Sequence, residues 1–242
     1  MKKLSAALAL ALTAAAASAD YQAEVGVAYF DFDGAETIAF EGEYHFQPVA
    51  TRSHPLVEAA FLERSNNVSL SHGRAEFGRV DVNTTRAEVE LYIPDTMLYV
   101  APFYTRTSTK YAGNSSSNND WGVTVGITPL DGFRVTTTYA DDVDYEFNFD
   151  VKYVLGLANN TAINMEFAYA DAPHSSMEDT VSAAADYYFD RTFSVGVEIV
   201  DAEDTAYGIR TQKFFTDTFS GFASYSKGDD VDTWAIGASL RF

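Results

Sequence analysis

The chain has 242 residues and no cysteine, and its 35 acidic residues against 16 basic ones give a formal net charge of −19. This charge argues against nucleic acid as a partner, because proteins that bind nucleic acid neutralise its phosphates with basic side chains. The lack of cysteine excludes zinc–thiolate sites, iron–sulfur clusters and cysteine nucleophiles.

The first 19 residues have the pattern of a secretory signal peptide. Lys2 and Lys3 form a positive start, residues 4–17 are rich in Ala and Leu, and Ala17-Ser18-Ala19 is an A-x-A cleavage site. We expect residues 20–242 to be the mature protein, with 14 basic and 35 acidic residues and therefore a formal charge of −21. A retained transmembrane helix is the alternative, although it would be short and very rich in Ala.

From residue 22 onward, apolar and polar residues alternate with the period of two that indicates β-strands. In 145–157, apolar residues occupy the odd positions from Tyr145 to Leu157, and Glu146, Asp150 and Lys152 fall at even ones. The 14 predicted strands are 22–32, 36–46, 56–66, 85–93, 97–107, 120–129, 132–140, 145–157, 161–170, 179–189, 192–201, 205–214, 218–226 and 231–242. The pattern is weakest in 56–66, and without that strand the count would be 12.

The predicted connections differ in length between the two ends of the strands. Those after odd-numbered strands are mostly longer and polar, for example 67–84 and 108–119, whereas those after even-numbered strands are mostly tight turns. The exception among the even ones is 47–55. Long loops at one end and short turns at the other are typical of an up-and-down outer-membrane barrel. An even number of strands would place both termini on the short-turn side, in the periplasm.

The length of the strands favours a barrel in lipid over a soluble fold. The strands run about ten residues, which is what a tilted strand needs to cross a bilayer, and they follow one another as hairpins without a long crossover. A closed sheet also pairs its own backbone polar groups, as hydrocarbon requires. The sequence therefore predicts an all-β, transmembrane, up-and-down antiparallel β-barrel in a Gram-negative outer membrane. A soluble all-β sandwich is the alternative, because it alternates in the same way.

The last predicted strand resembles the C-terminal assembly signal of bacterial outer-membrane proteins. Its apolar residues alternate up to an aromatic one, and the signal positions are Trp234, Ile236, Leu240 and Phe242. The resemblance implies recognition by the barrel-assembly machinery. An ordinary edge strand is the alternative interpretation.

Two short motifs resemble a family of small general bacterial porins of marine gammaproteobacteria. They are Tyr44–Val49, with the sequence YHFQPV, and Pro55–Arg64, with the sequence PLVEAAFLER. The resemblance implies a porin-like channel and names no solute. This chain is shorter than the trimeric porins of about 16 strands and has no clear constriction loop of their kind. A monomer and a homo-oligomer therefore both stay open.

The polar parity of the strands provides the candidate pore lining. We predict that these side chains face the lumen: Glu41, Glu43, Arg86, Glu88, Glu90, Arg134, Glu146, Asp150, Lys152, Glu166, Glu198 and Arg210. Carboxylates outnumber basic groups there by eight to four, and rings of carboxylates favour cations. The alternative is that these charges pair across the lumen and close it.

Catalytic and metal sites have weaker support. Some outer-membrane barrels are hydrolases with a Ser–His or Asp–His set near the outer rim. By register, His45 and His54 fall at the turn end and His72 and His174 in outer loops, and sequence spacing does not establish contact between a nucleophile and a base. The acidic stretches 141–144, 201–204 and 229–232 do not fit the twelve-residue calcium loop. We predict no catalytic residue, no metal site and no cofactor.

The residues alone leave two functions and one further alternative. The first is an outer-membrane channel for passive diffusion of small hydrophilic solutes or ions with a mild cation preference. The second is a closed structural or adhesive barrel whose loops meet a partner, and a lipid- or peptide-hydrolysing enzyme is a further alternative. The expected partners are outer-membrane lipid and lipopolysaccharide, the latter through divalent bridging from the acidic loops, together with the barrel-assembly machinery and the solutes.

Overall fold

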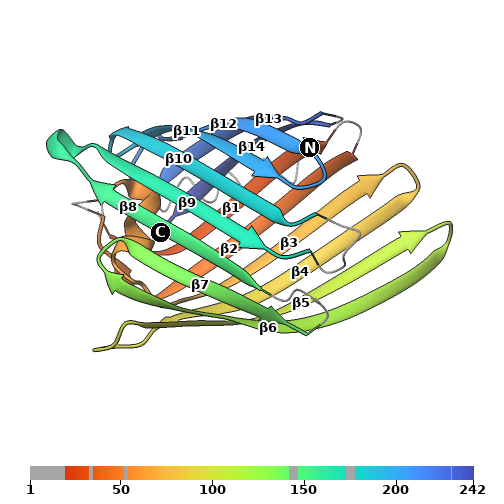
Figure 1. Ribbon diagram of the computed structural model, residues 1–242, viewed down its shortest axis with the longest axis horizontal. Helices are drawn as coiled ribbons and strands as arrows, with labels where there is room; N and C mark the ends of the chain where they lie inside the picture. Colours follow the sequence, from red (N-terminus) through yellow and green to blue (C-terminus); the bar gives the residue numbers. More distant parts are fainter. Residues whose placement is uncertain (1–19, 33–34, 52–53, 142–146, 173–177, 230) are drawn as a thin grey trace.

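The computed structural model describes residues 20–242 except 33–34, 52–53, 142–146, 173–177 and 230. The expected signal peptide therefore lies outside the described residues. Fourteen antiparallel strands close into one barrel in which each strand pairs with its sequence neighbours and β1 pairs with β14 (Figure 1). The strands are β1 Tyr21–Phe32, β2 Ala35–Val49, β3 Asn67–Phe77, β4 Val80–Tyr92, β5 Leu98–Tyr111, β6 Asn114–Leu130, β7 Phe133–Ala140, β8 Asn148–Gly156, β9 Ala162–Ala170, β10 Thr180–Asp190, β11 Phe193–Asp201, β12 Thr205–Phe214, β13 Phe219–Lys227 and β14 Asp232–Arg241.

The closing seam joins the first and the last strand of the barrel. The β1–β14 register runs from Glu24 opposite Arg241 to Phe32 opposite Thr233. Beyond that ladder, the carbonyl oxygen of Phe242 accepts hydrogen bonds from the N–H groups of Gln22 and Ala23 at 2.7 and 3.1 Å. Because this pairing removes the edges of the sheet, the backbone polar groups of both end strands are paired within the molecule.

The outer surface is apolar and the interior is polar, the reverse of a soluble protein. Ile209 is 60% exposed and Val197 is 59% exposed, whereas the polar Asn164 is only 1% exposed. Aromatic side chains meet in pairs on this surface, such as Trp121 with Tyr139 at a ring separation of 5.7 Å. Within the described part of the chain, no helix is long and apolar enough to cross a membrane.

The predicted third strand, 56–66, is wrong in kind, although the total of 14 strands is correct. Residues Leu56–Glu58 form a 3-10 turn (η1) and Ala59–Leu62 a single helical turn (α2). This helical part lies at the end of the barrel where the short turns gather (Figure 1). A helical face explains the six apolar residues among 56–62, which lack a strict period of two.

Two predicted outer loops are also wrong, because both are hairpins. The region 67–84 contains β3, the turn Gly78-Arg79 and the start of β4, and 108–119 contains the ends of β5 and β6 joined by Ala112-Gly113. Ala112 and Gly113 have φ values of 49° and 86°, the left-handed conformations that a tight two-residue hairpin requires. A further 3-10 turn, η2 (Ala158–Asn160), joins β8 to β9.

The barrel has an uneven outer rim, because its strands differ in length. β5 and β6 have 14 and 17 residues, whereas β7 and β8 have 8 and 9. The β3–β4 and β5–β6 hairpins accordingly reach furthest at the end opposite the helical turn (Figure 1).

Candidate functional site in the barrel lumen

The largest cavity, of about 480 Å³, lies inside the barrel between strands on several sides of the lumen. Eight of the predicted pore-lining residues border it: Arg86, Glu88, Arg134, Asp150, Lys152, Glu166, Glu198 and Arg210. Two further cavities of about 370 and 390 Å³ follow it. Neighbouring cavities share lining residues, including Lys152 between the first two and Val57 between the last two. The three spaces therefore lie side by side along the lumen.

One side of the lumen, which we call the paired wall, holds its charges in ion pairs. Its members stand on five consecutive strands and are Lys152, Glu166, Asp186, Glu198 and Arg210. The Arg210 guanidinium lies 2.5 Å from Asp186, 3.2 Å from Glu166 and 3.6 Å from Glu198. Glu166 also contacts the Lys152 Nζ at 3.1 Å. Each carboxylate of this wall therefore has a cation within ion-pair distance.

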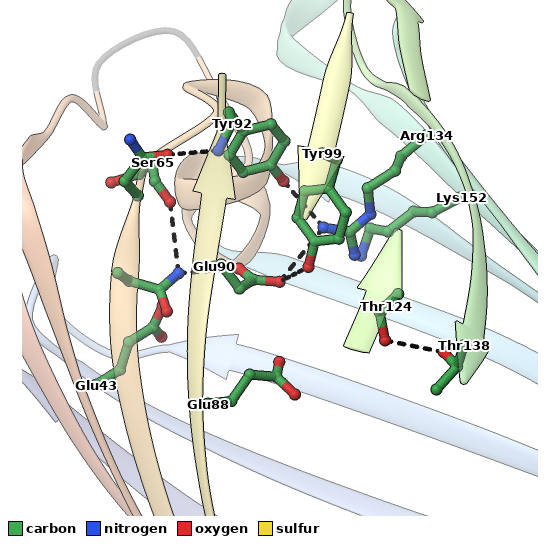
Figure 2. A network of polar contacts seen from close by, with 12 residues as sticks. Glu43, Ser65, Glu88, Glu90, Tyr92, Tyr99, Thr124, Arg134, Thr138 and Lys152 are labelled. Atoms are coloured by element: carbon green, nitrogen blue, oxygen red, sulfur yellow. Dashed lines mark hydrogen bonds and ion pairs between the residues drawn. The ribbon is translucent and has the colours of Figure 1, made fainter. Parts of the chain in front are cut away.

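A second polar network joins β4, β5 and β7 (Figure 2). The Tyr99 hydroxyl donates to Glu90, and the Arg134 Nη1 donates to the Tyr92 hydroxyl at 3.0 Å. Arg134 also lies 3.4 Å from Glu90 and stacks 4.4 Å above the Tyr99 ring. These contacts hold the guanidinium of Arg134, on β7, against side chains of β4 and β5. Its charge therefore has a fixed position in the lumen.

The opposite side, which we call the acidic wall, has carboxylates with fewer cations. It consists of Glu24 on β1 and Glu41 and Glu43 on β2, all bordering the 390 Å³ cavity. Glu24 pairs with Arg241 at 2.5 Å, and Glu43 lies 3.5 Å from the His45 Nε2. Glu41 makes no ion pair with any described residue, and neither does Asp150 on β8. The two walls thus differ in how fully their charges are compensated.

Residues 54–66, which we call the luminal segment, fold from the β2–β3 connection into the turn end of the barrel. The Leu56 N–H donates to the Arg191 carbonyl at 2.8 Å, and Arg241 donates to the Leu56 carbonyl at 2.7 Å. Leu56 is completely buried by these contacts. The segment therefore occupies part of the lumen cross-section between β10–β11 on one side and β14 on the other.

Glu58 binds the luminal segment to the paired wall. Its carboxylate accepts a hydrogen bond from the Tyr188 hydroxyl at 2.7 Å and lies 2.9 Å from the Lys152 Nζ. At the other end of the segment, Arg64 donates to the Thr128 carbonyl at 3.2 Å. Because Glu58 is only 4% exposed, its charge depends on these two partners for compensation.

The predicted pore-lining set is thus divided by the structure. Eight members meet in the largest cavity, Glu41 and Glu43 stand apart on the acidic wall, Glu90 belongs to the tyrosine network, and Glu146 lies outside the described residues. The sequence reasoning missed Glu24, Asp186 and Arg241, which the same parity rule on β1, β10 and β14 could have found. Glu58 had no such signal, because it lies in a 3-10 turn, where the parity rule for strands does not apply.

The assembly-signal positions lie on the outer apolar face or at its end. Trp234, Ile236 and Phe242 are exposed, and Leu240 is half-buried opposite Val25 on β1. Their recognition by an assembly machinery stays a prediction.

The histidines do not gather into one site. The His45 Nδ1 lies 3.1 Å from the Ser65 hydroxyl, but His45 is completely buried, so this contact holds the luminal segment against β2. His54 pairs with Glu63 and His72 contacts Thr85, whereas His174 lies outside the described residues. The described residues contain no group of three or more side chains suited to hold a metal ion.

One carboxylate links the end of β9 to the residues just before β10. Asp179 accepts hydrogen bonds from the Ala172 N–H at 3.0 Å and from the Tyr169 hydroxyl at 2.9 Å. The backbone donor first, and the hydroxyl second, hold the pKa of this carboxyl below its ordinary value.

The chain is similar to a known protein family and to solved structures. A family model described as "Putative general bacterial porin" matches residues 1–128 and 120–242. Among solved structures, the Acinetobacter baumannii outer membrane protein Omp33 has 24% identity and a TM-score of 0.77, over 93% of this chain and 100% of that one. The KdgM porin has 10% identity and a TM-score of 0.47, over 90% and 99% of the two chains. Among curated proteins, none matches the sequence.

Proposed function

The chain belongs to the family described as "Putative general bacterial porin", and from this premise we propose that it is a passive outer-membrane channel for small hydrophilic solutes and ions with a mild preference for cations. The observation that carries the proposal is the run of three cavities lined by charged side chains inside a barrel with an apolar outer surface. A charged, hydrated lumen of this kind offers a path that the surrounding hydrocarbon does not.

The luminal segment sets the narrowest part of the proposed path. Two of the three cavities border Val57, and one of them also borders Glu58, so solutes would pass between this segment and the barrel wall. Hydrogen bonds to β10, to the turn between β10 and β11, and to β14 keep the segment inside the lumen. We therefore expect a small conductance, well below that of barrels with about 16 strands and a wide aqueous channel.

The cation preference follows from the charges that remain uncompensated. Arg86, Arg134, Lys152 and Arg210 each have a carboxylate within ion-pair distance. By contrast, Glu41 and Asp150 have no ion-pair partner among the described residues. The net field in the lumen is therefore negative, which lowers the energy of a passing cation and raises that of an anion.

Planar-bilayer recording on the refolded mature protein tests this function. We expect stepwise currents of small amplitude and, under a potassium chloride gradient, a reversal potential of the sign that marks cation selectivity. An anion-selective reversal potential would contradict the charge assignment while leaving the channel intact. A bilayer that stays silent with correctly folded protein would contradict the channel itself.

A closed structural barrel is the second candidate, and the anchoring of the luminal segment is what favours it. If the segment seals the turn end, the wild-type protein would be silent in the bilayer. Replacement of residues 54–62 by a short Gly/Ser linker would then produce currents. The channel proposal instead predicts that wild type conducts and that the replacement raises its conductance.

A further inference from the structure

The outer face of the β3–β6 wall changes from apolar to polar along consecutive cross-strand rows. The cavity lining shows which residues face inward: Arg86 on β4, Tyr99 on β5 and Thr124 on β6 border the 480 Å³ cavity. Their neighbours of opposite parity face away from it, as the exposure of Tyr104 and Trp121 confirms. The outermost apolar row is Leu70, Ala87, Tyr104 and Trp121.

The next two rows are polar and contain exposed basic residues. The first consists of His72, Thr85, Arg106 and Asn119, and the second of Arg74, Asn83, Ser108 and Ser117. Arg106 and Arg74 stand on strands separated only by β4. Aromatic side chains mark the level of the membrane–water interface, so this switch just beyond Tyr104 and Trp121 places the basic groups at the height of the lipid headgroups.

Arg106 is available for an external partner. It is exposed, and it makes no ion pair or hydrogen bond with any described residue. Its neighbours in the row are oriented by internal contacts, since His72 Nδ1 lies 2.9 Å from the Thr85 hydroxyl and the Tyr104 hydroxyl donates to Asn119 at 2.9 Å. Arg74 is already engaged, at 2.8 Å from Glu76 and 3.6 Å from Asp81, so Arg106 is the unpaired member of the two.

We propose that this surface binds the phosphate groups of lipopolysaccharide through Arg106 and Arg74, assisted by the polar side chains between them. An arginine provides a planar fork of donors that matches phosphate geometry. The acyl chains of the same molecule would lie against the apolar row of Leu70, Ala87, Tyr104 and Trp121. Charge complementarity is what selects this occupant, because Arg106 is an exposed cation without an ion pair to any described residue and stands one row beyond the apolar row, where an anionic glycolipid would present its phosphates.

This proposal differs from divalent bridging by the acidic outer loops, because it needs no metal ion. It also extends beyond the channel function, since it concerns the outside of the barrel and holds for an open or a closed lumen. In this proposal the long β3–β4 and β5–β6 hairpins carry the binding surface, because the two polar rows lie where the strands continue past the membrane boundary.

Native mass spectrometry of the refolded mature protein in detergent with EDTA present would test the site. The probes are bisphosphorylated lipid A and fully dephosphorylated lipid A. We expect R74Q/R106Q to bind the bisphosphorylated form about tenfold more weakly than wild type, which corresponds to about 1.4 kcal/mol. The dephosphorylated form should bind wild type and variant equally weakly.

Lys227→Gln provides the matched control. Lys227 is an exposed outward-facing cation one row beyond Tyr225 and Trp234. Its cross-strand neighbours are Tyr207 and Asp232, so no second cation stands beside it. This variant should bind bisphosphorylated lipid A within about twofold of wild type. Equal binding by R74Q/R106Q and wild type, or equal binding of the two lipid forms to wild type, would overturn the proposal. Binding that appears only when magnesium replaces EDTA would overturn it in favour of the acidic loops.

Discussion

The two sides of the lumen use the same residue types in opposite ways. On the paired wall, Arg210 and Lys152 neutralise Glu166, Asp186 and Glu198 within ion-pair distance, and Asn164 adds hydrogen bonds to two of these carboxylates. On the acidic wall, Glu41 has no such partner among the described residues. Compensated charges hold the strands and the luminal segment together, whereas uncompensated charges act on whatever passes through.

Because of this difference, the paired wall should contribute mainly to the stability of the barrel and the acidic wall mainly to its ion selectivity. An ion pair withdrawn from water is costly to break, because the surviving partner keeps its desolvation penalty. A solitary carboxylate facing a hydrated cavity contributes little to folding but keeps its field. Substitutions on the two walls should therefore change different observables.

The largest effect should come from Arg210→Gln on the paired wall. Three carboxylates would lose their shared cation, and Asp186 is almost fully buried. Breaking a fully buried pair costs about 3–5 kcal/mol. Since the side chains of Arg210 and Glu166 are 29% and 35% exposed, we expect a loss of about 2 kcal/mol in the free energy of unfolding. Urea unfolding in detergent micelles measures it, with Lys227→Gln as a surface control. A variant as stable as that control would remove the distinction between the walls.

A smaller effect should follow from Tyr188→Phe, which tests the connection between the paired wall and the luminal segment. The substitution deletes one buried hydrogen bond to Glu58 and leaves Lys152 in place. We expect a loss of about 1 kcal/mol and a higher or noisier single-channel conductance. Tyr207→Phe is the control, because Tyr207 is exposed and makes no hydrogen bond to a described residue. An unchanged current would show that this hydrogen bond does not position the segment.

The smallest effect, and the one most specific to the acidic wall, should come from Glu41→Gln combined with Glu43→Gln. We expect the ratio of potassium to chloride permeability to fall about twofold, because two fixed charges leave the lumen. The free energy of unfolding should change by less than about 0.5 kcal/mol. Glu36→Gln, which removes a carboxylate from the outer face of the same strand, should leave the ratio unchanged. A large loss of stability would place these residues with the paired wall instead.

The sequence predicted the strands well wherever one face of a strand meets lipid. From β7 to β14 the observed bounds differ from the expected ones by only a few residues, because Phe, Val and Ile alternate with polar residues there. The alternation disappears beyond the membrane, where both faces of a strand meet water. Residues 72–77 and 108–119 contain few apolar side chains, such as Phe77 and Tyr111, so the outer ends of the hairpins have the composition of loops.

The luminal segment shows a different limit of sequence reasoning. A segment inside the barrel follows neither the lipid pattern nor the loop pattern, since its neighbours are the inner wall and the hydrated cavity. Leu56 and Ala59 are completely buried although they belong to a connection. Glu58 is buried because it contacts Tyr188 and Lys152, which are distant in sequence. Such partners become visible only when the barrel brings β8 and β10 next to residue 58.

Arg241 gives the seam of the barrel a second consequence. Its side chain pairs with Glu24 on the first strand, donates to the Leu56 carbonyl and stacks on Tyr21, so one guanidinium touches the first strand, the last strand and the luminal segment. A chain in which β1 and β14 have not yet paired lacks these three contacts. We therefore expect closure of the barrel between β1 and β14 and docking of the luminal segment to depend on each other when the protein folds.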